Sequence, residues 1–152
     1  MLVSFSSYHL WLHWRRPALY LAHEFLDFAP GIHFSQFQMQ SGTTGINSIR
    51  IYSPSKQVTD QDPKGLFIRR HLPELEDVPD KFLAEPHRMS AIQQQEANCQ
   101  IGTDYPAPIV DHKTAYAEAR RRMYGAKGKK EAKAEAAKVY QKHGSRRSPT
   151  PR

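Results

Sequence analysis

The sequence predicts an all-α protein with long irregular loops and a basic C-terminal helix, and three observations support this. Apolar side chains recur at three- and four-residue steps between residues 7 and 28, which is the period of an amphipathic helix. From residue 111 the chain is rich in Ala, Arg, Lys and Glu, which favour helices. Prolines punctuate the region between them, so we expect short helical segments joined by turns there.

The first predicted helix runs over residues 7–28. Its apolar face consists of Leu10, Trp11, Trp14, Ala18, Leu21, Ala22, Phe25 and Leu26. Pro17 interrupts the pattern, and because proline lacks an N–H and clashes with the preceding turn, we expect a kink or break near Arg15–Arg16. Pro30-Gly31 is expected to end the element.

The middle of the chain predicts one short helix after two irregular stretches. Residues 41–45 (SGTTG) predict a flexible polar connection, and residues 47–52 (NSIRIY) alternate like a strand but are few. A short helix is expected to begin at DPKG, with Asp62 as N-cap and Pro63 at the first helical position. Pro73 is expected to close it.

The C-terminal part predicts two basic helices. The first begins at Asp111, residues 125–128 (GAKG) break it, and residues 129–143 resume a helix. Glu and Lys side chains in the second are spaced for i,i+3 or i,i+4 contacts. Residues 145–152 (SRRSPTPR) are expected to be disordered. We therefore divide the chain into a main part, residues 1–122, and a basic extension, residues 123–152.

The size and composition of the chain limit the classes of function that it can have. The chain has 152 residues and a mean hydropathy of -0.70, which fits one domain with a core. Its single cysteine, Cys99, excludes an internal disulfide and fits a reducing, cytoplasmic location. No apolar run approaches the roughly 20 residues of a membrane span, and the N-terminus lacks the basic leader and cleavage site of a signal peptide. The net charge of +7 favours phosphate-bearing partners such as nucleic acid, although one solvated basic tail would also account for it.

The motifs of metal and phosphate chemistry are weak. His9 and His13 are the histidine pair at helical spacing, but no HExxH-like pattern accompanies them, so we expect no metal. The SGTTG stretch lacks the Lys-Ser/Thr that follows a phosphate-binding glycine loop.

Several longer motifs carry more information. They are RIYSP (residues 50–54), DPKGLFIRRHLPEL (residues 62–75) and DYPAPIVDHKTA (residues 104–115). With these motifs in this order, residues 4–122 or so resemble the C-terminal half of the photolyase/cryptochrome family. The resemblance implies part of a helical FAD-binding domain and therefore FAD as cofactor. It also implies a missing N-terminal antenna domain, and an apolar face over residues 8–28 that lacks its packing partner.

The resemblance assigns flavin-side positions to a group of four residues. Asp27 matches an aspartate of the flavin loop, where a carboxylate accepts from flavin N–H groups. His33 falls where an asparagine often faces flavin N5, and an imidazole there would donate a hydrogen bond. Ser35 and Gln36 line the same loop. The alternatives are a solvated acid for Asp27 and a satisfied surface histidine for His33.

Two further positions concern electron transfer to the flavin. Trp14 matches the middle tryptophan of the family's electron-transfer chain, and Phe37 falls at the inner one. Phenylalanine is much harder to oxidise than tryptophan, so Trp11 or Tyr8 would have to substitute. Core packing on an amphipathic helix is the alternative for Trp11 and Trp14.

The resemblance also implies DNA contacts. Met39 occupies a position that packs against a flipped lesion, and Arg50 matches an arginine near DNA phosphates. We expect one of Arg69 and Arg70 to pair internally with Glu74 or Asp77 and the other to face DNA. The leading hypothesis is a fragment of a photolyase-like flavoprotein that repairs pyrimidine dimers in UV-damaged DNA with light. The rivals are a cryptochrome-like blue-light sensor and a vestigial fragment that binds nucleic acid nonspecifically.

Overall fold

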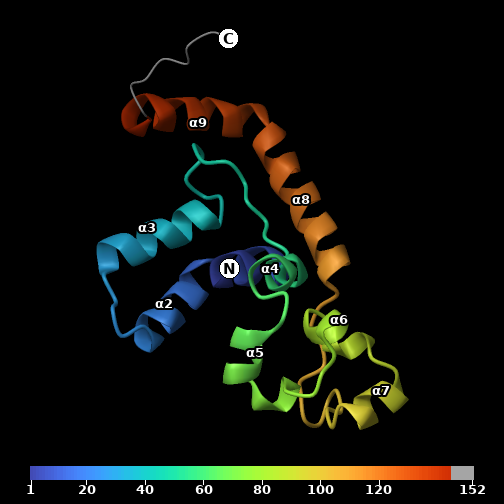
Figure 1. Cartoon of the computed structure of the whole chain (residues 1–152). Coiled ribbons are helices and arrows are strands. Elements are labelled where there is room, and N and C mark those ends of the chain that lie inside the picture. The colour runs from blue at the N-terminus through green and yellow to red at the C-terminus, as the bar shows by residue number, and fades with distance from the viewer. Residues whose placement is uncertain (145–152) are drawn as a thin grey trace. The chain divides into compact units, whose positions relative to one another are not determined.

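The computed structural model describes residues 1–144, and it confirms the all-α prediction for them (Figure 1). The predicted disorder of residues 145–152 lies outside the described residues. The helices are α1 (Leu2–Ser4), a π-helix (Phe5–His9), α2 (Arg15–Glu24), α3 (Pro30–Gln40), α4 (Pro54–Gln61), α5 (Leu66–His71), a 3₁₀-helix (Pro73–Leu75), α6 (Asp80–Leu83), a 3₁₀-helix (Pro86–Arg88), α7 (Ala91–Glu96), α8 (His112–Gly128) and α9 (Lys130–His143). The alternating stretch at residues 47–52 forms no strand.

The chain forms two compact units. The first contains Met1–Ile51 together with the C-terminal part from Lys113, and the second contains Tyr52–His112. The boundary that we predicted between residues 122 and 123 falls inside α8, which belongs to the first unit.

The predicted helix over residues 7–28 is wrong in its boundaries. The chain leaves the helical path after the π-helix Phe5–His9, and Trp11 has a φ of 52°. α2 begins only at Arg15, so Pro17 lies in its first turn. A proline there costs no intrahelical hydrogen bond, because the first N–H groups of a helix have no partner within it. Of the kink or break expected near Arg15–Arg16, the structure shows a break, over residues 10–14 just before α2.

Pro30 begins a helix instead of ending one. α2 ends at Glu24, and Pro30 is the first residue of α3, where its fixed φ suits the start of a helix. α2 and α3 pack together through Ala18, His33 and Phe37, which are all buried. This pair of helices carries most of the residues that the resemblance assigns to the flavin.

The two basic helices were predicted correctly apart from the position of their break. α8 continues through Gly125 to Gly128, and the helix is interrupted at Lys129, which has a ψ of 143°. A glycine inside a helix costs only about 1 kcal/mol relative to alanine, so Gly125 does not have to end α8. Lys127 Nζ donates to the carbonyl of Asn47 at 2.9 Å, and the expected helical ion pairing is seen between Lys138 and Glu135 at 3.2 Å.

The second unit has its own apolar core. The buried members are Leu75, Val78, Leu83, Met89, Ala97 and Cys99. Leu75 and Leu83 lie in short helices, whereas Val78, Met89, Ala97 and Cys99 lie in the turns and irregular segments between or after them. The pKa of the Cys99 thiol is raised, mainly by burial and to a smaller extent by the negative charges of Asp104 and Glu74. Cys99 thus acts as a small core residue.

An apolar surface is exposed on the first unit. It consists of Leu19, Tyr20, Phe25, Leu26, Phe28 and Ile32, and we call it the α2–α3 apolar patch. Phe25 and Leu26 of the predicted apolar face lie in this patch, whereas Ala18 of that face is buried. Among residues 1–144, no helix has the length and apolar character that crossing a membrane requires.

Candidate functional site

The α2–α3 pair encloses the imidazole of His33. The ring is 8% exposed and lies among four phenylalanine rings, with centroids 5.8 Å from Phe25, 5.1 Å from Phe28, 5.3 Å from Phe34 and 4.8 Å from Phe37. Aromatic rings at such separations pack favourably. His33 and Phe37 are one helical turn apart on α3, so both face this cluster.

A hydrogen bond fixes the orientation of the His33 ring. Its Nε2–H donates to the carbonyl oxygen of Ala18 at 2.8 Å, in a buried position. A carbonyl oxygen can only accept, so the proton must be on Nε2. This nitrogen is committed within the fold. His33 is therefore neither the surface histidine nor, through Nε2, the flavin N5 donor that the sequence suggested.

The other three flavin-side candidates lie at exposed positions. Asp27 is in the turn between α2 and α3, while Ser35 and Gln36 are on the exposed side of α3. The Ser35 hydroxyl donates to the carbonyl of Ile32 at 2.9 Å. Within residues 1–144 the Asp27 carboxylate makes no hydrogen bond or ion pair. The structure thus brings His33 and Phe37 together in the interior and leaves Asp27, Ser35 and Gln36 open to solvent.

Trp14 is the residue that the resemblance assigns to the middle of the electron-transfer chain. Trp14 is half-buried just before α2, with its ring 5.9 Å from that of His13 and the Arg15 guanidinium 5.6 Å above it. Trp11 is exposed and lies under the Arg122 guanidinium at 4.9 Å. Both tryptophans therefore carry a stacked cation, and neither belongs to the buried core.

Tyr8 is the buried alternative to Trp11 as an electron donor. Its hydroxyl has no hydrogen-bond partner among the described residues, and burial raises the pKa of Tyr8 to about 12. A phenol gives up its proton when it is oxidised, so it needs a nearby acceptor. The surroundings of Tyr8 disfavour this role.

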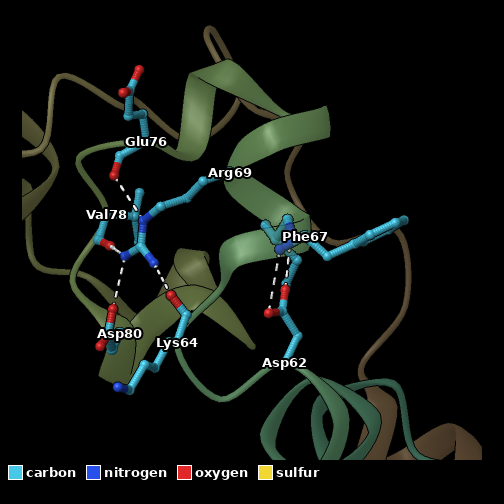
Figure 2. A network of polar contacts seen from close by, with 8 residues as sticks. Asp62, Lys64, Phe67, Arg69, Glu76, Val78 and Asp80 are labelled. Atoms are coloured by element: carbon cyan, nitrogen blue, oxygen red, sulfur yellow. Dashed lines mark hydrogen bonds and ion pairs between the residues drawn. The ribbon is translucent and has the colours of Figure 1, made fainter.

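In the second unit, Arg69 forms the centre of a polar network (Figure 2). Its guanidinium donates to the carbonyl oxygens of Lys64, Glu76 (2.9 Å) and Val78 (2.6 Å), and it pairs with Asp80 at 2.9 Å. Five N–H groups in a rigid fork let arginine satisfy several acceptors at once. The prediction that one arginine pairs internally holds for Arg69.

The predicted partners of Arg69, Glu74 and Asp77, were wrong. Asp80 lies eleven positions away in sequence, and nothing in the local pattern identified it. Arg70 is exposed and makes no ion pair or hydrogen bond within the described residues. It is therefore the arginine of this pair that is free for an outside ligand.

Two local features hold α5 so that Arg69 reaches the network. The Asp62 carboxylate accepts from the N–H groups of Phe67 (3.3 Å) and Ile68 (2.9 Å), as Figure 2 shows. The Asp62 side chain thus caps α5, but the predicted N-cap position is wrong: Gly65 is the N-cap, and Pro63 lies before the helix, which begins at Leu66. Gly65 has a φ of 65°, in the left-handed region that favours glycine, and a Cβ there would clash with Leu83 Cδ1.

The remaining DNA-side candidates belong to the first unit. Met39 is half-buried near the end of α3, and Arg50 is exposed in the irregular segment that follows. Arg50 makes no hydrogen bond or ion pair within the described chain. It is thus available for a phosphate in the same sense as Arg70.

The basic helix α8 carries a carboxylate held by two arginines. Glu118 accepts from Arg121 Nη2 at 2.7 Å and from Arg122 Nε at 2.5 Å. These hydrogen bonds lower the pKa of Glu118 to about 2. Two of the basic charges of α8 are therefore partly neutralised within the helix.

Comparison with solved structures identifies the type of domain. A class III photolyase from Agrobacterium tumefaciens matches with a TM-score of 0.72 and 28% identity over 90% of this chain and 27% of that one. A cryptochrome from Synechocystis sp. PCC6803 matches with a TM-score of 0.74 and 27% identity over 78% of this chain and 25% of that one. The fold is that of a helical domain found in both photolyases and cryptochromes.

Sequence comparison then gives the family. The family model for the FAD-binding domain of DNA photolyase matches residues 1–125. A deoxyribodipyrimidine photo-lyase from Alkalihalophilus pseudofirmus is 35% identical over 111 residues, which cover 72% of this chain and 23% of that protein. The chain belongs to the FAD-binding domain family of DNA photolyase, whose cofactor is FAD. It spans about a quarter of the length of these relatives.

The described residues fit FAD at one edge only. Asp27 fits, because its exposed carboxylate is free to accept a hydrogen bond from a ring N–H. Ser35 and Gln36 are exposed on the neighbouring helix. His33 does not fit through Nε2, which is already donated to Ala18.

Proposed function

We propose that this chain is part of a photolyase-type flavoprotein that repairs pyrimidine dimers in UV-damaged DNA with light. The observation that carries the proposal is the family match over residues 1–125. That match includes the exposed, unpaired side chains of Asp27, Arg50 and Arg70. FAD, when bound, supplies the light-excited electron for cleavage of the dimer.

In this proposal the residues of this chain bind and position the flavin and the DNA. Asp27 accepts from the flavin ring, while Ser35 and Gln36 offer further polar groups to the cofactor. Arg50 and Arg70 each bind a DNA phosphate, because a guanidinium donates two parallel hydrogen bonds to one phosphate group. Such contacts fix a protein on DNA without reading its sequence. The dimer must leave the base stack to be reached, and the Met39 thioether packs against it.

Recharging of the flavin through the family's tryptophan chain is impaired in the proposal. Phe37 is buried at the inner position and is hard to oxidise. Trp14 retains a position from which it can pass an electron, with the Arg15 guanidinium 5.6 Å from its ring. A cation near the ring disfavours oxidation of the indole, because oxidation adds a positive charge. We therefore expect slow photoreduction.

DNA binding and repair provide the test. The Arg70→Gln variant should bind a UV-irradiated duplex about tenfold more weakly than the unchanged chain, since a charged hydrogen bond to phosphate is lost. Arg16→Gln is the matched control, because Arg16 is exposed and its replacement removes the same charge. Equal losses for both variants would mean that only net charge matters. Absence of dimer cleavage under blue light in the protein with bound FAD would overturn the repair activity.

A cryptochrome-like sensor is the second candidate, and the His33–Phe37 cluster favours it. Both positions depart from the residues expected in repair enzymes, and their rings pack 4.8 Å apart in the interior. The similarity to a cryptochrome structure is as strong as that to a photolyase structure. Intact flavin photochemistry without dimer cleavage would select this function. A cytoplasmic location remains a prediction from the single cysteine.

Nonspecific binding of nucleic acid through the basic C-terminal helices is the remaining alternative. Such binding would fall steeply with salt and would not distinguish damaged from undamaged DNA. Deletion of residues 126–152 would then abolish all DNA binding. Retained preference for damaged DNA after this deletion would exclude it.

A further inference from the structure

A polar groove on the first unit is lined by none of the flavin-side residues Asp27, His33, Ser35 and Gln36. It has a volume of about 450 Å³. We call it the polar groove, and its lining residues are His13, Trp14, Arg15, Gln38, Thr43 and Thr44. They come from three segments: the entry to α2, the end of α3 and the turn that follows α3.

The charge of the polar groove is positive. Its lining contains one guanidinium and no carboxylate. Arg15 forms no ion pair with another described residue, and its guanidinium carbon lies over the Trp14 ring, 5.6 Å from the ring centroid. An arginine stacked on an aromatic ring is held in place while its N–H groups remain available.

The neutral lining residues add donors. His13 Nδ1 accepts from the backbone N–H of Arg15 at 3.3 Å, which places the ring proton on Nε2 as a donor. The Thr44 hydroxyl accepts from Asn47 Nδ2 at 2.9 Å, so its own proton is left to donate. The Gln38 side-chain amide has no hydrogen-bond partner within residues 1–144. The groove thus presents donors from four side chains.

The start of α2 does not supply these donors. The N–H of Arg15 is bonded to His13, the N–H of Arg16 donates to the carbonyl of His13 at 3.1 Å, and Pro17 has none. The groove therefore depends on its side chains and not on the helix terminus.

We propose that the polar groove binds a phosphate group, carried either by a free nucleotide or by a nucleic-acid backbone. A phosphate offers several acceptor oxygens to one guanidinium and to neighbouring neutral donors, which is the combination present here. The Trp14 ring at the edge gives a base or sugar attached to that phosphate an apolar surface. The proposal does not depend on FAD or on lesion recognition.

Fluorescence of Trp14 provides the measurement. Trp11→Phe leaves Trp14 as the single tryptophan, because the chain has two. Inorganic phosphate should change its emission in a saturable manner, whereas chloride at the same ionic strength should not. In this background, Arg15→Gln should weaken phosphate binding about tenfold or more, and the matched control Arg16→Gln should leave it within twofold. Thr44→Val should weaken it less than Arg15→Gln.

Two results would overturn the proposal. One is an identical response to phosphate and chloride. The other is an equal loss in Arg15→Gln and Arg16→Gln, since net charge would then be the cause. The source of the phosphate follows from competition with adenosine monophosphate and with an undamaged oligonucleotide. Displacement by the mononucleotide alone identifies a nucleotide site, and Arg15-dependent displacement by the oligonucleotide identifies a backbone contact. Weaker phosphate binding in Arg15→Gln and Thr44→Val, without any change in FAD retention, separates this site from the proposed function.

Discussion

Replacement of Arg69 by methionine should lower the free energy of unfolding by about 1–4 kcal/mol. Its guanidinium donates to the carbonyl oxygens of Lys64, Glu76 and Val78 and pairs with Asp80. Val78 is fully buried, so loss of this bond costs about 1–3 kcal/mol for a buried acceptor. The Asp80 side chain is 62% exposed, and solvent screening limits that pair to about 0–1 kcal/mol. Water can replace the donor at the two exposed carbonyls.

Urea denaturation followed by far-UV circular dichroism measures this change. Arg70→Met is the matched control, because Arg70 is exposed and unpaired within the described chain; we expect a change within about 0.5 kcal/mol. Asp80→Asn should cost no more than about 1 kcal/mol, since the carbonyl bonds remain. If Arg69→Met and Arg70→Met unfold at the same urea concentration with the same slope, the network does not stabilise the second unit.

Three further predictions concern backbone, core and surface. Gly65→Ala should destabilise the chain by about 1–3 kcal/mol, measured as a lower melting temperature, because φ is 65° and Leu83 blocks a Cβ; an unchanged melting temperature would refute the clash. His33→Leu should cost about 1–2 kcal/mol in urea denaturation, since the buried Ala18 carbonyl loses its donor, and a more stable variant would show that the hydrogen bond is not needed. The pKa of Glu118 is lowered to about 2 in the fold, so its contribution is present above the usual Glu pKa of about 4.3 and is lost as pH falls toward 2. Helix content of the unchanged chain should therefore fall between these values more than that of Glu118→Gln, and identical acid titrations would contradict this.

The sequence indicated those features of the fold that depend on local patterns. The helical character, the basic α8–α9 pair and the capping role of Asp62 all follow from periodicity, composition or a capping residue within a few positions. The start of α2 was misplaced because a proline is equally acceptable in a first turn and at a kink. The π-helix at Phe5–His9 has no comparable sequence signal.

The features that the sequence missed depend on contacts between distant residues. Arg69 pairs with Asp80 and not with Glu74 or Asp77, which are nearer in sequence, because the turn after α5 brings the Asp80 carboxylate within 2.9 Å of its guanidinium. The family resemblance implies that the His33 imidazole faces the flavin. In the structure it donates to the carbonyl of Ala18, fifteen positions earlier in the sequence. The polar groove joins three separate segments, and no single motif marks them.

The most direct test of the account is retention of FAD by the purified chain. After addition of FAD and removal of the excess, we predict an absorption band with vibronic structure that differs from that of free FAD. Asp27→Asn should retain less flavin than the matched control Glu24→Gln, because Glu24 is exposed at the end of α2 and carries the same charge. A chain that elutes without flavin would contradict the claim that these residues form an FAD-binding edge.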